Sequence, residues 1–315
     1  MAGQEGQQRQ LRASTLRMYR RYVTEDISPA LGRYRLSDLH PQVVDEFVAG
    51  LLADGRGKVT VRRIHATLSS ALTSARKLRL IAVNPAADVE LPDGTRRKVR
   101  PWEPAELGTF LGVAAEHRLG ALFEVAAFTG LRRGELCALR WSDVDLVNQV
   151  ITVRTQLVHT GSQRLEGKPK TRSGEDRRLD IGSRVVGALL AHQLAQQSER
   201  EAAGTAYQDN DRVFCREDGA DLDPDNVSRI FRRLVAKAEL RPVRLHDVRH
   251  GAASLMLASG TDIAVVSKRL GHSTLSLTAD TYSHLIGGIG RQAADAAEAI
   301  VPASAHTLHT SRPQK

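Results

Sequence analysis

Two stretches far apart in the chain contain side chains that could bind a phosphate and attack it. TGLRRGEL and the residues from 241 to 285 contribute Arg132, His246, Arg249, His272 and Tyr282. Guanidinium groups bind phosphate oxygens through paired hydrogen bonds, and a tyrosine hydroxyl can form a covalent phosphoester. Adjacent cations favour the phenolate form that such an attack requires. The set therefore predicts a site that holds one phosphate and attacks it with the tyrosine.

The segment that carries the histidine–arginine pair is predicted to be a helix. Apolar residues recur at near-helical spacing across residues 245–259, and Gly260 is a suitable end. Residues three apart lie on one face of a helix, so His246 and Arg249 project together.

A second helix, over residues 262–270, is expected to position His272. Thr261 is its predicted amino-terminal cap, and Gly271 ends it. The histidine then lies at an exposed junction, and a short helical stretch over residues 274–281 leads to the tyrosine.

The composition bounds the size and the partners of the protein. The 315 residues are enough for about two domains, and 41% hydrophobic residues can fill their cores. A net charge of +9 and a sequence pI of about 9.9 favour a polyanionic partner, first of all nucleic acid. Aromatic residues make up only 4%, which argues against base-stacking platforms. A solvated basic surface is the alternative, because charge alone does not identify a ligand.

Cysteine usage and hydropathy exclude several classes of protein. Cys137 and Cys215 are the only cysteines and neither belongs to a CxxC pair, so neither a disulfide framework nor a cysteine zinc site is expected. The start lacks an apolar leader, and no run approaches membrane-spanning length. We therefore expect a cytoplasmic protein without membrane association.

Prolines, glycines and charge runs divide the chain into parts. Helices are expected from Ser14, after Pro41 and over residues 60–78, and the turn cluster LPDG follows them. The predicted parts are a disordered lead (1–13), a helical domain (14–92), a linker (93–101), a second domain (102–301) and a disordered tail (302–315).

The second domain is predicted to be mixed. Its further expected helices cover residues 104–115, 120–128, 185–201 and 224–238. Alternating polarity predicts strands over 149–156 and 177–181, with a charged hairpin tip over 164–174 between them. A shorter strand-like run covers 213–215. The predicted fold class is mainly α with a small antiparallel β-sheet.

Basic residues gather at both ends of the helix predicted over residues 60–78. They are Arg56, Lys58, Arg62, Arg63, Arg76 and Lys77. Cations at both ends of one helix suit contacts with the phosphates of a DNA duplex. A solvated charged face is the equally simple alternative.

Five motifs occur in a fixed order, namely TGLRRGEL, PKTRSG, LHDVRH, LGHS and TADTYSHL. In this order and at these separations they resemble the tyrosine recombinase, or phage integrase, family of site-specific DNA recombinases. The resemblance covers about residues 14–300, nearly the whole chain. It implies an amino-terminal helical core-DNA-binding domain of the SAM-like type and a carboxyl-terminal α+β catalytic domain.

The resemblance assigns roles to the residues of the motifs. Arg132 and Arg249 bind the non-bridging oxygens of the scissile phosphate, and Tyr282 is the nucleophile that forms a 3′-phosphotyrosyl intermediate. His246 accepts the tyrosine proton, and His272 hydrogen-bonds the phosphate.

Two further residues are carried over from the family. Lys170, in the hairpin, supplies a proton to the departing 5′ oxygen, with Lys168 and Arg172 as competing assignments. Glu135 takes the place of an acid that, in the family, stabilises the active site. Because the bond energy is kept in the phosphotyrosine, the reaction implies no cofactor and no metal.

The implied function is site-specific recombination through a Holliday junction. The residues of the motifs TGLRRGELCALRW and PKTRSG resemble those of mobile-element integrases, which favours integration or excision of a mobile element. The implied partners are double-stranded DNA recombination sites, further copies of the chain in a tetramer on paired sites, and an accessory DNA-bending or directionality factor. An apolar face over residues 290–301 is interpreted as a helix that docks on a neighbouring protomer, with packing on its own domain as the alternative.

Many phage-type integrases carry an additional amino-terminal domain that binds arm-type DNA sites. Here only residues 1–13 precede the first expected helix. The chain is therefore either a two-domain recombinase of the simpler kind or one that has lost an upstream domain.

Other functions fit parts of the pattern. A Xer-like chromosome or plasmid resolvase and a catalytically silent DNA-binding protein would share the fold, and a type IB topoisomerase would share the tyrosine chemistry. A metal-dependent phosphodiesterase would need an acidic cluster, which the sequence lacks. His246 and His250 have the spacing of a zinc pair, but Arg249 puts a cation beside it and no third ligand is evident. The residues leave open the target sequence, the preferred direction and the accessory factors.

Overall fold

The chain divides into two compact units, which meet in the sequence between Lys98 and Val99. The structure, a computed structural model, describes residues 13–94, 100–160, 163–169, 172–276, 278–279 and 298. Most of the described residues are helical, and the larger described sheet is antiparallel, so the predicted fold class is confirmed.

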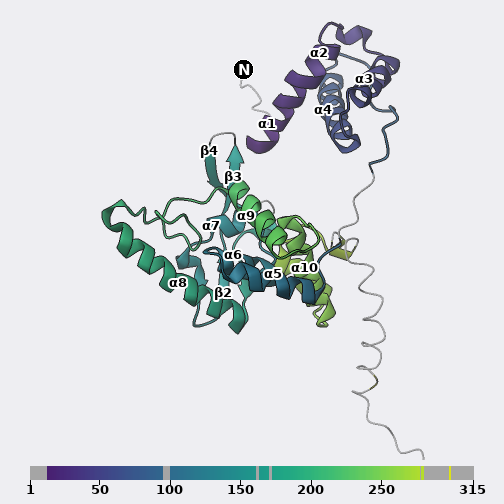
Figure 1. Ribbon diagram of the computed structural model, residues 1–315. Helices are drawn as coiled ribbons and strands as arrows, with labels where there is room; N and C mark the ends of the chain where they lie inside the picture. The colour runs from purple at the N-terminus through teal and green to yellow at the C-terminus, as the bar shows by residue number, and fades with distance from the viewer. Residues whose placement is uncertain are drawn as a thin grey trace, which may run out of the picture. The chain divides into compact units, whose positions relative to one another are not determined.

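The amino-terminal unit is a helical bundle (Figure 1). Its elements are α1 (Ala13–Tyr22), a π-helical stretch (Val23–Ile27), α2 (Ser28–Leu31), a 3₁₀ turn (Leu36–Asp38), α3 (Pro41–Ala53) and α4 (Lys58–Lys77). Pro41 occupies the first helical position of α3, where its missing N–H costs nothing. Val44 and Phe47 of α3 share one buried cluster with Ile64 and Leu68 of α4. The helices predicted after Pro41 and over residues 60–78 are therefore confirmed.

The carboxyl-terminal unit is built around α6 (Gly120–Thr129). This helix packs against α5 (Pro104–Ala115), α8 (Ser183–Ala203) and α10 (Leu245–Ala258), and most of its residues are buried. A helix that is apolar on every side belongs in the centre of a fold. The chain leaves this central helix directly into the TGLRRGEL motif, so that motif starts from the best-packed part of the unit.

Aromatic rings join α5 and α6 to α9 (Pro224–Lys237). Phe110, Phe123 and Phe231 have ring centroids 5.1 to 5.9 Å apart, and Trp102 lies 5.0 Å from Phe110. Full burial of one such side chain stabilises a fold by roughly 1.5–3 kcal/mol. The cluster gives the elements beneath the motifs a rigid base.

Strands β1 (Val144–Asp145), β2 (Val150–Val153) and β5 (Arg177–Asp180) form an antiparallel sheet in the order β1-β2-β5. In β5 the side chains alternate between buried and exposed, and Leu179 pairs with Ile151 of β2. The predicted second strand is thus confirmed, with an inward face that begins at Arg177.

Two strand predictions were wrong. The predicted strand over 149–156 is split, because β3 (Gln156–Thr160) leaves β2 and forms a separate two-stranded sheet with β4 (Gln163–Gly167). Residues 164–167 are therefore strand and not hairpin tip. The run over 213–215 contributes only the isolated bridge between Cys215 and Asp221.

The polar composition of β4 explains the first error. Its charged residues were interpreted as loop, but Glu166 is ion-paired with Arg212 and Arg140 at 2.9 and 3.0 Å. A strand whose charges find such partners needs no apolar alternation, so periodicity alone cannot identify it.

The predicted helices around the LHDVRH and LGHS motifs are confirmed, with one change of cap. Asp262, and not Thr261, caps α11 (Ile263–Leu270), because its carboxylate accepts the backbone N–H of Ala264 at 2.7 Å. A further short helix, α7 (Arg133–Ala138), begins within the TGLRRGEL motif.

Several predictions fall outside the described residues. They concern the lead (1–12), residues 95–99 of the linker, Lys170, Tyr282, the tail (302–315) and the predicted docking helix except for Glu298.

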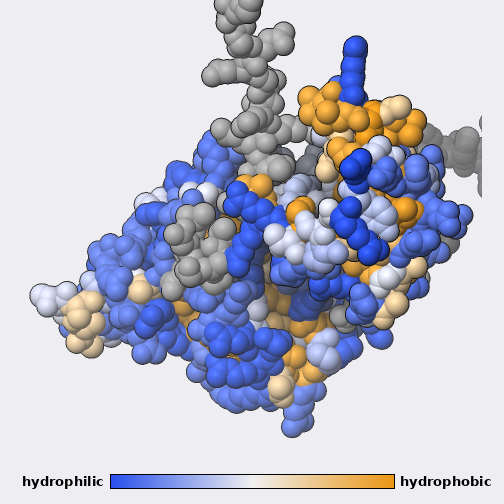
Figure 2. Space-filling model, turned by 90° about the horizontal axis from the view of Figure 1, so that it is seen from above, coloured by the Kyte–Doolittle hydropathy of each residue, from blue (hydrophilic) through white to orange (hydrophobic). Residues whose placement is uncertain are grey.

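Among the described helices, none combines the length and the apolar character that crossing a membrane would need. The face shown in Figure 2 is mostly hydrophilic, with smaller hydrophobic areas between the charged side chains.

Candidate active site

Arg132 is positioned by the break between α6 and α7. Gly130 ends α6 with φ +65°, a left-handed conformation that favours glycine. Arg132 then occupies the cap position of α7, and its backbone N–H donates to Glu135 Oε2 at 2.8 Å. The same carboxylate accepts Nη1 of the Arg132 side chain at 2.8 Å. The cap fixes both the backbone and the guanidinium.

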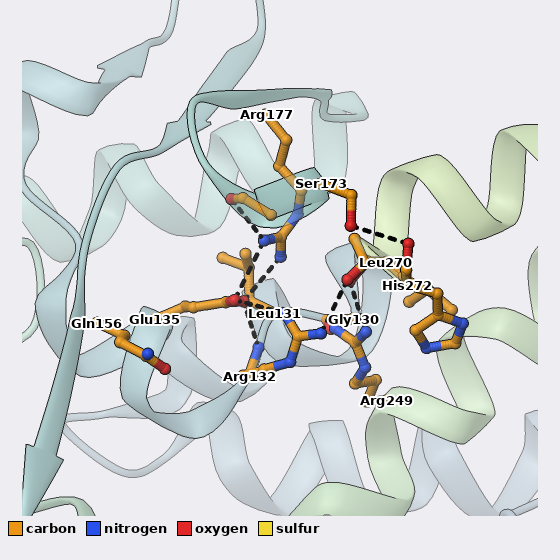
Figure 3. A network of polar contacts seen from close by, with 12 residues as sticks. Gly130, Leu131, Arg132, Glu135, Gln156, Ser173, Arg177, Arg249, Leu270 and His272 are labelled. Carbon is orange, nitrogen blue, oxygen red and sulfur yellow. Dashed lines mark hydrogen bonds and ion pairs between the residues drawn. The ribbon is translucent and has the colours of Figure 1, made fainter. Parts of the chain in front are cut away.

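Arg249 lies on α10, one turn after His246, as the helical spacing predicts. Its side chain is buried and donates to Gly130 O at 2.7 Å and to Leu270 O at 2.5 Å. Arg132 Nη2 donates to the next carbonyl, Gly271 O, at 2.9 Å. The two predicted phosphate-binding arginines are therefore held at one place, the end of α11 (Figure 3).

His272 is placed by the end of α11. Gly271 has φ +64°, its N–H donates to Lys268 O, and the N–H of His272 donates to Ser267 O. This is the Schellman arrangement, which fixes the residue after the glycine. The imidazole Nδ1 hydrogen-bonds with Thr278 Oγ1 at 2.7 Å, and the carbonyl of His272 accepts Ser173 Oγ at 2.9 Å.

The histidines of the site are held neutral at pH 7. Burial, then His250 and Arg249, lower the pKa of His246 to about 4. Burial, then Arg249 and Arg132, lower the pKa of His272 to about 4. His250 packs edge-on against His246 with ring centroids 5.5 Å apart, and burial lowers its pKa too. Neutral imidazoles are able to accept a proton.

Sequence reasoning missed Arg177. This buried arginine of β5 pairs with both oxygens of Glu135, at 2.7 and 3.1 Å, and its Nε donates to Arg269 O at 3.1 Å. Burial raises the pKa of Glu135, but Arg177 and then Arg132 outweigh it, so the net pKa lies below the ordinary value. Its place on the inward face of β5 was the available signal.

The segment around the predicted lysine is only partly described. Lys170 lies outside the described residues, as does the side chain of Arg172. Lys168 is exposed and lies 3.3 Å from Glu175, while its carbonyl accepts Gln156 Nε2 at 2.8 Å. The assignment of Lys170 thus stays a prediction.

The predicted DNA-binding residues of the amino-terminal unit differ in their surroundings. Arg56 is paired with the buried carboxylate of Asp26 at 2.8 Å. Arg62 donates to Pro92 O at 3.3 Å, yet its side chain is exposed. The remaining predicted contacts, Lys58, Arg63, Arg76 and Lys77, are also exposed.

The described part of the site has groups that can bind an anion and groups that can accept a proton. Arg132 and Arg249 bring two guanidinium groups together, and His246 and His272 bring neutral imidazoles beside them. Within the described residues, no three His, Cys, Asp or Glu side chains cluster as metal ligands. Two cations and two neutral bases suit phosphoryl chemistry.

Comparisons with known proteins agree with this chemistry. The model of the phage integrase family matches residues 104–286. The ICEBs1 integrase of Bacillus subtilis (strain 168) is 29% identical over 258 residues, which cover 81% of this chain and 69% of that protein. Tyrosine recombinase XerC of Xanthomonas campestris pv. campestris (strain B100) is 30% identical over 285 residues, which cover 88% of this chain and 80% of that protein.

Among solved structures, the chain is similar to the Tn1549 transposon integrase in complex with transposon right-end DNA. The TM-score is 0.78 at 22% identity, and the match covers 91% of this chain and 95% of that one. At this identity the likeness concerns the fold. Together with the family model and the relatives, it shows that the chain belongs to the phage integrase family and is a tyrosine-type site-specific DNA recombinase.

Proposed function

We propose that this recombinase integrates and excises a mobile DNA element, and that it cleaves each strand through Tyr282. The observation that carries the catalytic proposal is the convergence of Arg132 and Arg249 on adjacent carbonyls, Gly271 O and Leu270 O, next to His272. The ICEBs1 and Tn1549 integrases among the similar proteins support a mobile element.

The two arginines are proposed to hold the scissile phosphate. Cleavage builds negative charge on the non-bridging oxygens, and guanidinium groups that are already oriented stabilise this charge without reorganising. Glu135 and the carbonyls at the end of α11 supply that orientation. His272, fixed after Gly271, is proposed to donate a further hydrogen bond to the phosphate.

Proton transfer is proposed to run from Tyr282 to His246 and from Lys170 to the departing 5′ oxygen. The low pKa of His246 leaves the imidazole neutral and able to accept the phenol proton. A phosphate that enters beside it raises that pKa, because an anion favours the imidazolium. His246 is thus neutral before DNA binds and becomes a stronger base once DNA is bound.

The proposed partners are double-stranded recombination sites, other copies of the chain and an accessory bending or directionality factor. The net charge of +9 supports DNA as a partner, as do five exposed basic residues of α4, namely Lys58, Arg62, Arg63, Arg76 and Lys77. A tetramer on paired sites, joined by the helix predicted over residues 290–301, is proposed for strand exchange. Deletion from Gly288 onward should abolish synapsis in a native gel, and normal strand exchange by the shortened chain would contradict the docking role.

Chromosome or plasmid resolution is the second candidate. The 30% identity to the Xanthomonas XerC favours it. The two candidates differ in the arrangement of the sites, since integration joins two DNA molecules and resolution acts within one.

One experiment tests both functions without knowledge of the target. A supercoiled plasmid library with randomised inserts is incubated with the protein, and DNA that remains attached after denaturation is sequenced. The recovered sites are then placed on two plasmids or as direct repeats on one plasmid. Efficient joining of two plasmids supports the integrase proposal, and reaction only within one plasmid supports resolution. Recovery of no attached DNA would overturn the proposed chemistry.

A further inference from the structure

Arg177 joins the proposed phosphate site to its support. Its guanidinium is 5% exposed and the Glu135 carboxylate is fully buried, so their bidentate pair is out of reach of water. Glu135 also holds Arg132, both at the backbone and at the side chain. One carboxylate thus serves two arginines (Figure 3).

The end of α11 is held by a series of donors. Its last carbonyls accept in sequence, Arg269 O from Arg177, Leu270 O from Arg249 and Gly271 O from Arg132. These carbonyls lack partners within a helix, and cations next to them also oppose the negative end of the helix dipole. Arg177 is therefore one of three arginines that fix the backbone from which His272 projects.

Arg177 also affects the net charge around Arg132. Arg132, Arg177 and Glu135 together carry one net positive charge. Without Arg177, the buried carboxylate would face Arg132 alone, and the pair would carry none. A neutralised guanidinium attracts a phosphate less, because the two charges oppose each other at short range in a poorly solvated place.

We infer that Arg177 is a positioning residue for the recombinase: it balances Glu135, so that the charge of Arg132 remains directed at the scissile phosphate. The inference rests on the proposed function, because it takes Arg132 as a phosphate ligand. It adds to the cleavage site a residue that does not itself touch the DNA.

The test compares two scissile phosphorus groups of different charge. Single-turnover cleavage is measured on a duplex recovered by the library selection, with either the normal phosphodiester or a neutral methylphosphonate at the scissile position. Arg177→Met should slow cleavage of the phosphodiester by roughly tenfold to a hundredfold, the effect of losing one oriented charge contact. Its rate on the methylphosphonate should stay within about threefold of the unmodified protein, since the transition state there carries one negative charge fewer for Arg132 to stabilise.

A matched control separates this effect from general destabilisation. Arg212 is equally buried, pairs with Glu166 and Asp221, and lies outside the proposed site. Arg212→Met should change both cleavage rates by the same factor, whatever it does to the melting temperature. Equal loss on both substrates in Arg177→Met would make Arg177 a structural residue and overturn the inference, as would unchanged rates on both.

A second variant keeps the inference testable if Arg177→Met folds poorly. Poor folding could occur because that variant leaves the buried Glu135 carboxylate with Arg132 as its remaining arginine partner. The double variant Glu135→Gln with Arg177→Met removes both charges of the pair and keeps the shape of the capping side chain. Its preference for the phosphodiester, which is the ratio of the cleavage rates on phosphodiester and methylphosphonate, should return to that of the unmodified protein, because no carboxylate then neutralises Arg132. A double variant that still lacks this preference contradicts the inference.

The outcomes also distinguish the inference from the proposed function. If the unmodified protein forms no adduct that depends on Tyr282, the proposed function fails. If that adduct forms and Arg177→Met behaves like Arg212→Met, the inference alone fails.

Discussion

Arg132 and Arg249 each use part of their hydrogen-bonding capacity on the protein itself. Arg132 donates to Glu135 and Gly271 O, and Arg249 donates to Gly130 O and Leu270 O. An arginine held in this way loses little freedom when a phosphate arrives, and a rigid donor acts more strongly on developing charge than a mobile one.

Removal of either arginine should therefore stop cleavage without stopping DNA binding. Arg132→Ala or Arg249→Ala should lower the single-turnover cleavage rate by about a hundredfold or more, the loss expected for one transition-state donor. Affinity measured by gel shift should change little, because many other phosphate contacts support it. A variant that loses DNA binding but cleaves normally once bound would contradict the assigned role.

Two histidines of the site, His246 and His272, make stability depend on pH. His246 and His272 have a pKa of about 4 in the folded chain against an ordinary value of 6.5. Between these values the unfolded chain binds more protons, so the free energy of unfolding falls as the pH drops from about 6.5 towards about 4. Urea melts at stepped pH should show this loss.

The matched variant for this measurement is His246→Asn, which removes one such group. Its free energy of unfolding should depend less steeply on pH over the same window. A dependence as steep as that of the unmodified protein would show that the imidazole of His246 is not responsible.

At the residue scale, sequence reasoning found the motif residues that are proposed to carry the chemistry, and missed Arg177, which we infer to act through Glu135. His246 and Arg249 could be paired from helical spacing, and the resemblance supplied the roles of Arg132 and His272. Arg177 could not be recognised because its partner Glu135 lies far away in the sequence. A strand pattern shows that a residue points inward, but not which charge it meets there.

At the scale of elements, the end of α11 organises the described site. Its Schellman turn places His272. Its carbonyls accept hydrogen bonds from three arginines, which belong to the amino-terminal cap of α7, to α10 and to β5. The turn depends on Gly271, where an added Cβ would lie 3.1 Å from Gly174 Cα and in a left-handed backbone conformation.

Gly271→Ala should consequently lower both stability and cleavage. The strained backbone costs about 1–3 kcal/mol, and any relief of it moves His272. Gly260→Ala is the control, because Gly260 also has a positive φ but nothing lies within 4 Å of an added Cβ. Equal melting temperatures for both variants, with equal cleavage rates, would show that the close contact at Gly271 has no consequence.

The helices were predictable to within a few residues because their signals are local. Proline at the start of α3, α5 and α9, and glycine after α6 and α11, mark ends that depend only on backbone chemistry. The β3–β4 pair was not predictable in the same way, because its polar strand is stabilised by ion pairs with distant residues.

At the scale of the whole molecule, 45 Lys and Arg against 36 Asp and Glu favour a polyanion. Five of the exposed basic residues lie near the two ends of α4, namely Lys58, Arg62, Arg63, Arg76 and Lys77. Each phosphate contact by such a cation releases a counterion from DNA, so binding weakens as salt rises.

The logarithm of DNA affinity should fall with the logarithm of salt concentration with a slope of about −4 or steeper. Lys77→Gln should reduce that slope by about one, with little effect on sequence preference. Fluorescence anisotropy over a salt series measures both. A flat dependence would mean that these residues form a solvated surface and not a DNA-binding one.

The most direct test of the central claim is the covalent adduct itself. A nicked duplex with a site recovered from the library traps the cleaved strand, and a denaturing gel then compares the native protein with Tyr282→Phe. An adduct at the 3′ phosphate with the native protein, and none with Tyr282→Phe, is the predicted result. An adduct that survives in Tyr282→Phe, or specific DNA binding with no adduct from the native protein, would contradict the account.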